Sequence, residues 1–178
     1  GERRGGFMLN CMNGQAWAFL RERGVGRYSP SIELNAGQIR ALSEPVELVV
    51  YGRMPLMWLR HCPLRAALSL PGKHADCRRC DACGAGEGLD GRTMRDRRGA
   101  EFPLRRIAAD GGCVALLQNC DTLMLLRRAE KLPPAAAWRL LLEEEDDISA
   151  VVRAYRRAAM GESVRDETIL QMEHTTTG

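Results

Sequence analysis

Three cysteines, Cys77, Cys80 and Cys83, form a C-x-x-C-x-x-C run inside a stretch that has no helical or strand periodicity. The stretch 71–91 is rich in glycine, cysteine and charge, so it offers few apolar side chains for a core of its own. An irregular segment of this length inside a folded domain needs an internal tether. Closely spaced thiolates supply one when they turn toward a shared soft metal ion. The run therefore predicts a metal centre.

Two further cysteines stand where they could complete such a centre. Cys62 lies fifteen positions before Cys77, and Cys113 lies thirty positions after Cys83. Four thiolates suit either tetrahedral zinc or a [4Fe–4S] cluster, and the spacing does not decide between the two. The side chains of His61 and His74 are alternative ligands for zinc.

The remaining cysteines and the rest of the composition indicate a reducing compartment. Cys11 and Cys120 have ordinary surroundings, which favours small buried residues. Seven cysteines, an odd number with a tight run, favour metal or redox chemistry over a disulfide framework. No segment approaches the ~18 apolar residues of a membrane span, and no secretory signal is evident. We expect a cytoplasmic protein without a membrane span.

Helices and strands alternate along much of the chain, which predicts an α/β fold with parallel strands. At 178 residues and 45% apolar content the chain is long enough to bury a core, and its net charge of +3 selects no partner. The expected helices are 14–23, 35–42, 122–131 and 146–160. The expected strands are 26–29, 47–51, 114–117 and the buried 138–142, with a β-hairpin of arms 93–97 and 101–107 around Arg98-Gly99.

Basic residues cluster on this hairpin. Arg95, Arg97, Arg98 and Arg105 could hold the phosphates of a nucleic acid or another anionic substrate. Asp96 is better suited to orienting these arginines than to catalysis. An ion pair between Arg97 and Asp96 that braces the hairpin is the structural alternative.

Several motifs resemble one known family when they are read in order. They are Glu47-Leu-Val-Val-Tyr-Gly-Arg-Met-Pro-Leu-Met57, Arg60-His-Cys-Pro63, the cysteine run, Met94-Arg-Asp-Arg-Arg-Gly-Ala-Glu-Phe-Pro-Leu104, Cys113 and Asn119, with Ser31-Ile-Glu-Leu-Asn35 upstream and Trp138-Arg-Leu-Leu-Leu downstream. Together they look like the collagenase-like peptidases of unknown mechanism, peptidase family U-thirty-two. The resemblance covers nearly the whole chain.

The resemblance implies the C-terminal βα units of a TIM-barrel-like domain with a cysteine-rich insertion. On this interpretation residues 1–60 are barrel βα units, 61–113 the insertion with its hairpin, 114–161 the closing βα units and 162–178 a polar tail. Because the chain starts at Gly1 without methionine and ends in a threonine-rich tail, we expect a piece of a longer protein that carries the rest of the barrel.

The resemblance also implies a function. Several family members look like iron–sulfur proteins that support oxygen-independent hydroxylation of RNA bases or quinone precursors, with prephenate as the oxygen source. The implied [4Fe–4S] ligands are Cys62, Cys113 and two of the three cysteines of the run. The chain departs from the family pattern at Met54-Pro55, where another cysteine is frequent, and in having three thiols in the run where two are expected.

Two other functions stay open at this point. The family name suggests a peptidase, but no H-E-x-x-H or G-x-S-x-G motif is present and no catalytic residue can be named. His61 and Cys62 are adjacent in sequence, which does not by itself make a catalytic pair. The third function is a structural zinc module that tethers the irregular segment.

Overall fold

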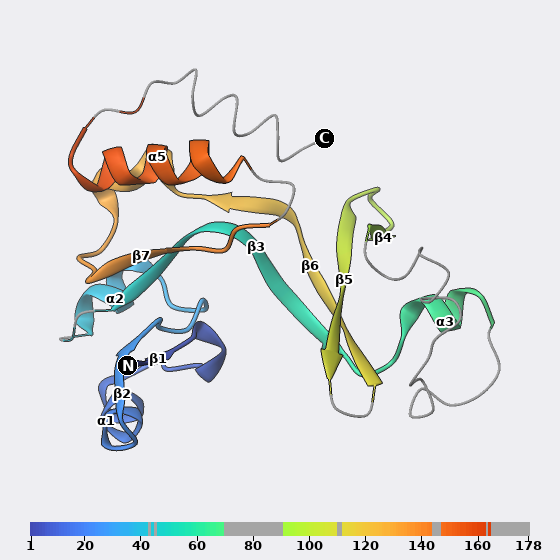
Figure 1. Cartoon of the computed structure of the whole chain (residues 1–178), viewed down its shortest axis with the longest axis horizontal. Coiled ribbons are helices and arrows are strands. Elements are labelled where there is room, and N and C mark those ends of the chain that lie inside the picture. Colours follow the sequence, from blue (N-terminus) through green and yellow to red (C-terminus); the bar gives the residue numbers. More distant parts are fainter. Residues whose placement is uncertain are drawn as a thin grey trace. The chain divides into compact units, whose positions relative to one another are not determined.

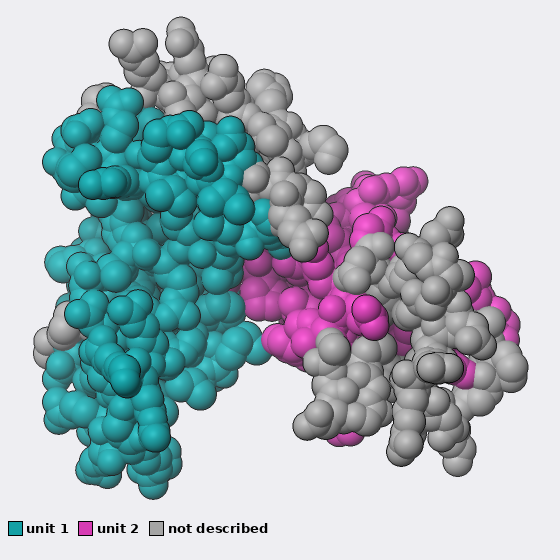
Figure 2. Space-filling model, viewed as in Figure 1, with its two compact units in different colours: residues 1–52, 123–178 teal, residues 53–122 magenta. Residues whose placement is uncertain are grey.

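The structure is a computed structural model that describes residues 1–42, 44, 46–69, 91–109, 112–143, 147–162 and 164, with only the backbone of 108, 109, 112 and 113. The chain divides into two compact units (Figure 2). Unit 1 comprises Gly1–Gly52 and Leu123–Gly178, and unit 2 comprises Arg53–Thr122. The sequence predicts boundaries after residues 60 and 113, whereas the units change over after residues 52 and 122.

Unit 1 begins with a small βαβ arrangement. Strands β1 (Arg3–Gly5) and β2 (Val25–Tyr28) pair in parallel, and helix α1 (Gly14–Glu22) lies between them in sequence, after the short 3-10 helix η1 (Phe7–Leu9). A parallel pair needs such a crossover connection. The predicted helix and extended stretch are both confirmed here.

Local capping explains where the helices of this region begin and end. Asn13 accepts a hydrogen bond from the backbone of Ala16 at 2.9 Å, and Gly24 follows α1 with a φ of +81°. Helix α2 (Ala36–Ala41) begins with a capping box, in which Asn35 and Gln38 each bind the other's backbone N–H. The predicted second helix is therefore confirmed.

A five-stranded mixed sheet carries the rest of the fold (Figure 1). Its order is β4-β5-β6-β3-β7, with β3 at Glu47–Leu59, β4 at Arg92–Arg95, β5 at Glu101–Ala109, β6 at Gly112–Met124 and β7 at Ala137–Leu140. Strands β3 and β7 are parallel, whereas β4-β5 and β5-β6 are antiparallel. The α/β class is confirmed, and β1-β2 and β3-β7 are parallel pairs within a mixed arrangement.

The strand predicted to end at Tyr51 is longer than expected. Strand β3 continues through Gly52 to Leu59, so treating this glycine as a terminator was wrong. Gly52 has a φ of +117°, and a Cβ there would lie 2.2 Å from the backbone oxygen of Leu141. The glycine therefore permits a close backbone approach inside the strand.

The helix predicted at 122–131 is also wrong. Residues 122–124 belong to β6, and Leu126–Lys131 forms the 3-10 helix η3. The backbone N–H of Leu125 donates to the carbonyl of Val50 at 3.1 Å, so strand pairing overrides local helix propensity. The strand predicted at 138–142 is β7, and its side chains are half-buried rather than buried.

The main core lies in unit 1. It gathers Trp17, Tyr28, Val50 and Tyr155, with Trp17 and Tyr28 stacked at 4.4 Å between ring centroids. Helix α5 (Ile148–Ala159) faces this core with residues spaced at i, i+3 and i+4, as the amphipathic pattern predicts. Asp147 caps its start, and Gly161 follows its end with a φ of +78°. Among the described residues no helix is long and apolar enough to cross a bilayer.

Candidate metal centre

Cys62 lies at the turn between the end of β3 and helix α3 (Pro63–Ala67) in unit 2. It is the N-cap residue of α3, and Pro63 follows at the first helical position, where its missing N–H costs nothing. Its side chain makes no capping hydrogen bond, and the residue is only 1% exposed. The turn therefore holds the thiol inside the protein.

A small apolar cluster surrounds this thiol. Leu64 of α3, Leu104 of β5 and Ala115 of β6 are buried with Cys62, and partly buried leucines of β3 and β6 pack against them. In Figure 1 the C-terminal ends of β3 and β5 lie beside the N-terminal end of β6. Cys62 is thus enclosed by four elements of unit 2.

The backbone of Cys113 comes to the same region. Cys113 pairs with Ala108 across β5 and β6, and it stands two positions before Ala115 in β6. Two positions along a strand correspond to about 7 Å between Cα atoms. The structure therefore brings Cys62 close to the strand that carries Cys113, although fifty residues separate the two in sequence.

The other predicted ligands fall outside the described residues. Cys77, Cys80 and Cys83, as well as His74, belong to the stretch 70–90. In the rest of the chain that is described, no three cysteine, histidine or acidic side chains gather as a metal site. The cysteine run lies outside these residues, so the predicted ligand set stays a prediction.

The predicted arginine hairpin is confirmed as a hairpin. Strands β4 and β5 pair from Arg92↔Leu104 to Arg95↔Glu101, and Gly99 has a φ of +88° in the turn. Asp96 accepts hydrogen bonds from the backbone N–H groups of Arg98 and Ala100 at 2.8 and 3.0 Å. Asp96 therefore shapes the turn through the backbone rather than through the predicted ion pair with Arg97.

The four candidate arginines have different roles in the structure. Arg95 forms an ion pair with Glu101, and Arg105 donates to the buried Gln118 at 3.4 Å. Arg97 and Arg98 are exposed at the tip, and in the described part of the chain no side-chain group pairs with either guanidinium. Two of the four arginines are therefore available for an anionic partner.

His61 and Cys62 differ sharply in environment, although they are neighbours in sequence. His61 is exposed, whereas Cys62 is buried in its apolar cluster. No hydrogen bond joins the two within the described residues. This arrangement gives no support to a Cys–His nucleophile pair, which requires the base within hydrogen-bond reach of the thiol.

A buried ionic group in unit 1 was not predicted from the sequence. Glu47, at the start of β3, is 2% exposed and forms an ion pair with Arg139 of β7, and Arg4 of β1 approaches its other oxygen at 3.6 Å. Val49 and Arg139 are paired in register, which places the guanidinium beside the strand that carries Glu47. The only sequence signal is an acidic residue opening an apolar strand.

Cys11 and Tyr28 form a second buried polar group in unit 1. Both are 1% exposed, which confirms the interpretation of Cys11 as a small core residue. Burial raises the pKa of the Cys11 thiol. Burial, reinforced by the neighbouring Cys11 and Glu44, raises the pKa of Tyr28 to about 12. Both groups therefore stay neutral at ordinary pH, so nothing here resembles a reactive thiolate.

No protein-family model, curated protein or solved structure matches the chain. Residue geometry therefore provides the only support for a function. The family that the motifs resemble stays a prediction.

Proposed function

We propose that unit 2 holds a [4Fe–4S] cluster, with ligands from Cys62, Cys113 and two of Cys77, Cys80 and Cys83. The cluster would support an oxygen-independent hydroxylation or related modification of RNA or a small aromatic substrate. The proposal places the protein in the cytoplasm, where thiols stay reduced.

The observation that carries the proposal is the position of Cys62. Its thiol is buried at the end of β3, in one cluster with Ala115, and Ala115 is two residues from Cys113. Two ligands distant in sequence would thus lie at one end of unit 2, and the cysteine run falls between them in the sequence.

The surroundings of Cys62 suit an iron–sulfur centre. Leu64, Leu104 and Ala115 form an apolar wall on the thiol side, and burial of a cluster tunes its reduction potential. When bound, such a cluster supplies one-electron transfer or a Lewis-acidic iron. The protein's own contribution would be to fix the thiolates and to exclude water around Cys62.

The hairpin would supply the contact to the substrate. Arg97 and Arg98 extend from the turn shaped by Asp96, and their guanidinium groups can hold phosphates in a bidentate manner. Such contacts position an RNA but do not read its sequence. The substrate base or ring would be recognised elsewhere.

The parallel pairs of unit 1 are compatible with a TIM-barrel-like domain. Strands β1 and β2, with α1 between them, form a βαβ unit, and β3 and β7 form a second parallel pair. We propose that these pairs belong to a barrel whose remaining strands lie in a longer chain, as the family resemblance implies.

The test is metal and sulfide analysis after anaerobic purification. We expect about four iron and four sulfide per chain, with a brown colour, in the unaltered protein. Cys62→Ser and Cys113→Ser should each lose most of the iron. Cys120→Ser is the matched control, because this partly buried cysteine of unit 2 lies outside the proposed ligand set, and it should retain the metal.

Two results would overturn the proposal in different ways. A colourless protein with one zinc per chain that depends on the same cysteines indicates the structural zinc module. Peptide hydrolysis that survives replacement of Cys62 and Cys113 but stops on His61→Ala indicates the peptidase.

A further inference from the structure

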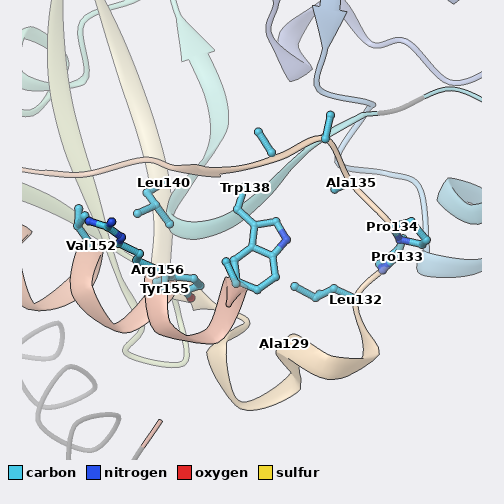
Figure 3. A pocket seen from close by; sticks show the side chains of 13 residues that line it. Ala129, Leu132, Pro133, Pro134, Ala135, Trp138, Leu140, Val152, Tyr155 and Arg156 are labelled. Atoms are coloured by element: carbon cyan, nitrogen blue, oxygen red, sulfur yellow. The ribbon is translucent and has the colours of Figure 1, made fainter. Parts of the chain in front are cut away.

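Unit 1 contains a cleft beside helix α5. It has a volume of about 610 Å³ and is bordered by β7, α5 and the segment that joins η3 to β7 (Figure 3). Leu132, Pro133, Leu140 and Val152 contribute to an apolar lining. Sites for small organic molecules have this size and combine apolar side chains with a few polar groups.

Two aromatic rings give the cleft a rigid flat surface. Trp138 and Tyr155 meet edge to face, with centroids 6.1 Å apart and planes at 88°. The Tyr155 hydroxyl donates to the carbonyl of Val50 at 2.8 Å, which fixes its ring inside the core. Trp138 projects into the cleft from β7 and is only half-buried (Figure 3). Its ring therefore offers a stacking surface that is already held in place.

Polar groups in the cleft favour an anion. Among the described residues, Arg156 is the one charged residue of its lining, and no acidic side chain lines it. Among the described residues no group pairs with the Arg156 guanidinium, and none accepts the indole N–H of Trp138. A ligand that combines a flat ring with a negative group would pair with Arg156 and cover the apolar wall.

We propose that this cleft binds an aromatic carboxylate, with its ring against Trp138 and its carboxylate at Arg156. The ring contributes most of the affinity, because stacking and apolar burial outweigh a single exposed ion pair. The carboxylate provides the selectivity over neutral rings. The site requires no metal and lies in unit 1, so it can be tested independently of the cysteine centre.

The test is isothermal titration calorimetry with 2-naphthoate and its neutral counterpart, 2-naphthalenemethanol. We expect saturable binding of 2-naphthoate at one site per chain, about tenfold tighter than the alcohol. Arg156→Gln should reduce this preference at least about threefold and leave alcohol binding unchanged. Val152→Glu, which places a negative charge at an exposed lining position, should weaken 2-naphthoate specifically.

Arg153→Gln is the matched control, because it removes the same charge from the exposed surface of α5 outside the cleft lining. It should leave both affinities unchanged. The proposal fails if 2-naphthoate does not bind at millimolar concentration, if acid and alcohol bind equally, or if Arg153→Gln has the same effect as Arg156→Gln.

Discussion

The two units differ in what holds them together. In unit 1, aromatic and aliphatic side chains from two strands and two helices form one buried cluster that includes Trp17, Tyr28, Val50 and Tyr155. In unit 2, the buried cluster of described residues consists of Cys62, Leu64, Leu104 and Ala115. One of the four is a cysteine, and another is an alanine with little area to bury.

Among the described residues, the buried cluster is extensive in unit 1 and small in unit 2. Apolar burial stabilises by roughly 25 cal/mol per Å², so a cluster of four modest side chains contributes little against the entropy of ordering its strands. Small folded units compensate with a metal or another cross-link. On the proposed function, a metal centre at Cys62 would add to the packing that holds unit 2 together.

The largest expected effect follows from removing that centre. Cys62→Ser, or chelation of the metal, should increase proteolytic cleavage within 53–122 about tenfold or more, because metal binding energy is folding energy. Cleavage within unit 1 should change little. Limited proteolysis with mass spectrometry measures both, with Cys120→Ser as control. If both units become equally sensitive, or neither does, the comparison is incorrect.

A smaller effect is expected from the buried carboxylate of unit 1. Glu47→Gln leaves Arg139 without its ionic partner and should lower the free energy of unfolding by about 2 kcal/mol, since Arg139 keeps partial access to water. Glu101→Gln breaks the exposed pair with Arg95 in unit 2 and should cost about 0.5 kcal/mol or less. Urea denaturation compares the two. Equal losses would show that burial does not distinguish these pairs.

The arginines at the hairpin tip should affect RNA binding and not folding. Replacing Arg97 and Arg98 with glutamine should weaken binding of a single-stranded RNA about fivefold. It should also reduce the slope of log Kd against the logarithm of the salt concentration by about one to two. The control removes two exposed charges from unit 1, at Arg128 and Arg153. Fluorescence anisotropy at several salt concentrations gives both quantities. A similar loss in the control would mean that only net charge matters.

The smallest effect concerns pH and unit 1. Burial raises the pKa of Tyr28 to about 12, above the value of about 10 expected in the unfolded chain. The folded state therefore holds this proton more tightly, so its contribution is complete below pH 10 and is lost as pH rises toward 12.

Tyr28→Phe isolates this contribution. Among the described residues no oxygen or nitrogen atom hydrogen-bonds the Tyr28 hydroxyl, so the variant should stay within about 1 kcal/mol of the unaltered protein at pH 8. Between pH 8 and pH 11 the free energy of unfolding of the variant should fall less than that of the unaltered protein, because the variant has no Tyr28 hydroxyl to titrate. Denaturation at the two pH values tests this, and identical losses would contradict the assignment.

Local signals in the sequence were sufficient for much of the fold. The capping box of Asn35 and Gln38, the glycine after α1 and the Arg98-Gly99 turn each act within a few residues, and all three are present in the structure. Non-local effects were not predictable. Gly52 reads as a strand terminator until Leu141 is known to pass beside it, and Leu125 is held by groups far away in sequence.

In the candidate site, too, local signals could be predicted from the sequence and non-local contacts could not. The spacing of the cysteines and the family resemblance pointed to Cys62 as a ligand, and the structure places this thiol in a buried cluster beside the strand of Cys113. The Glu47–Arg139 pair joins residues ninety-two positions apart. No local pattern reveals such a pair, because each partner alone looks like an ordinary strand residue.

X-ray absorption spectroscopy of the metal in the anaerobically purified protein tests the central idea most directly. If thiolates from separate stretches share one centre, the first shell contains sulfur only, at about 2.3 Å, and Cys62→Ser depletes the metal while Cys120→Ser preserves the sulfur shell. A first shell of nitrogen or oxygen, or a metal content that Cys62→Ser leaves unchanged, would contradict it.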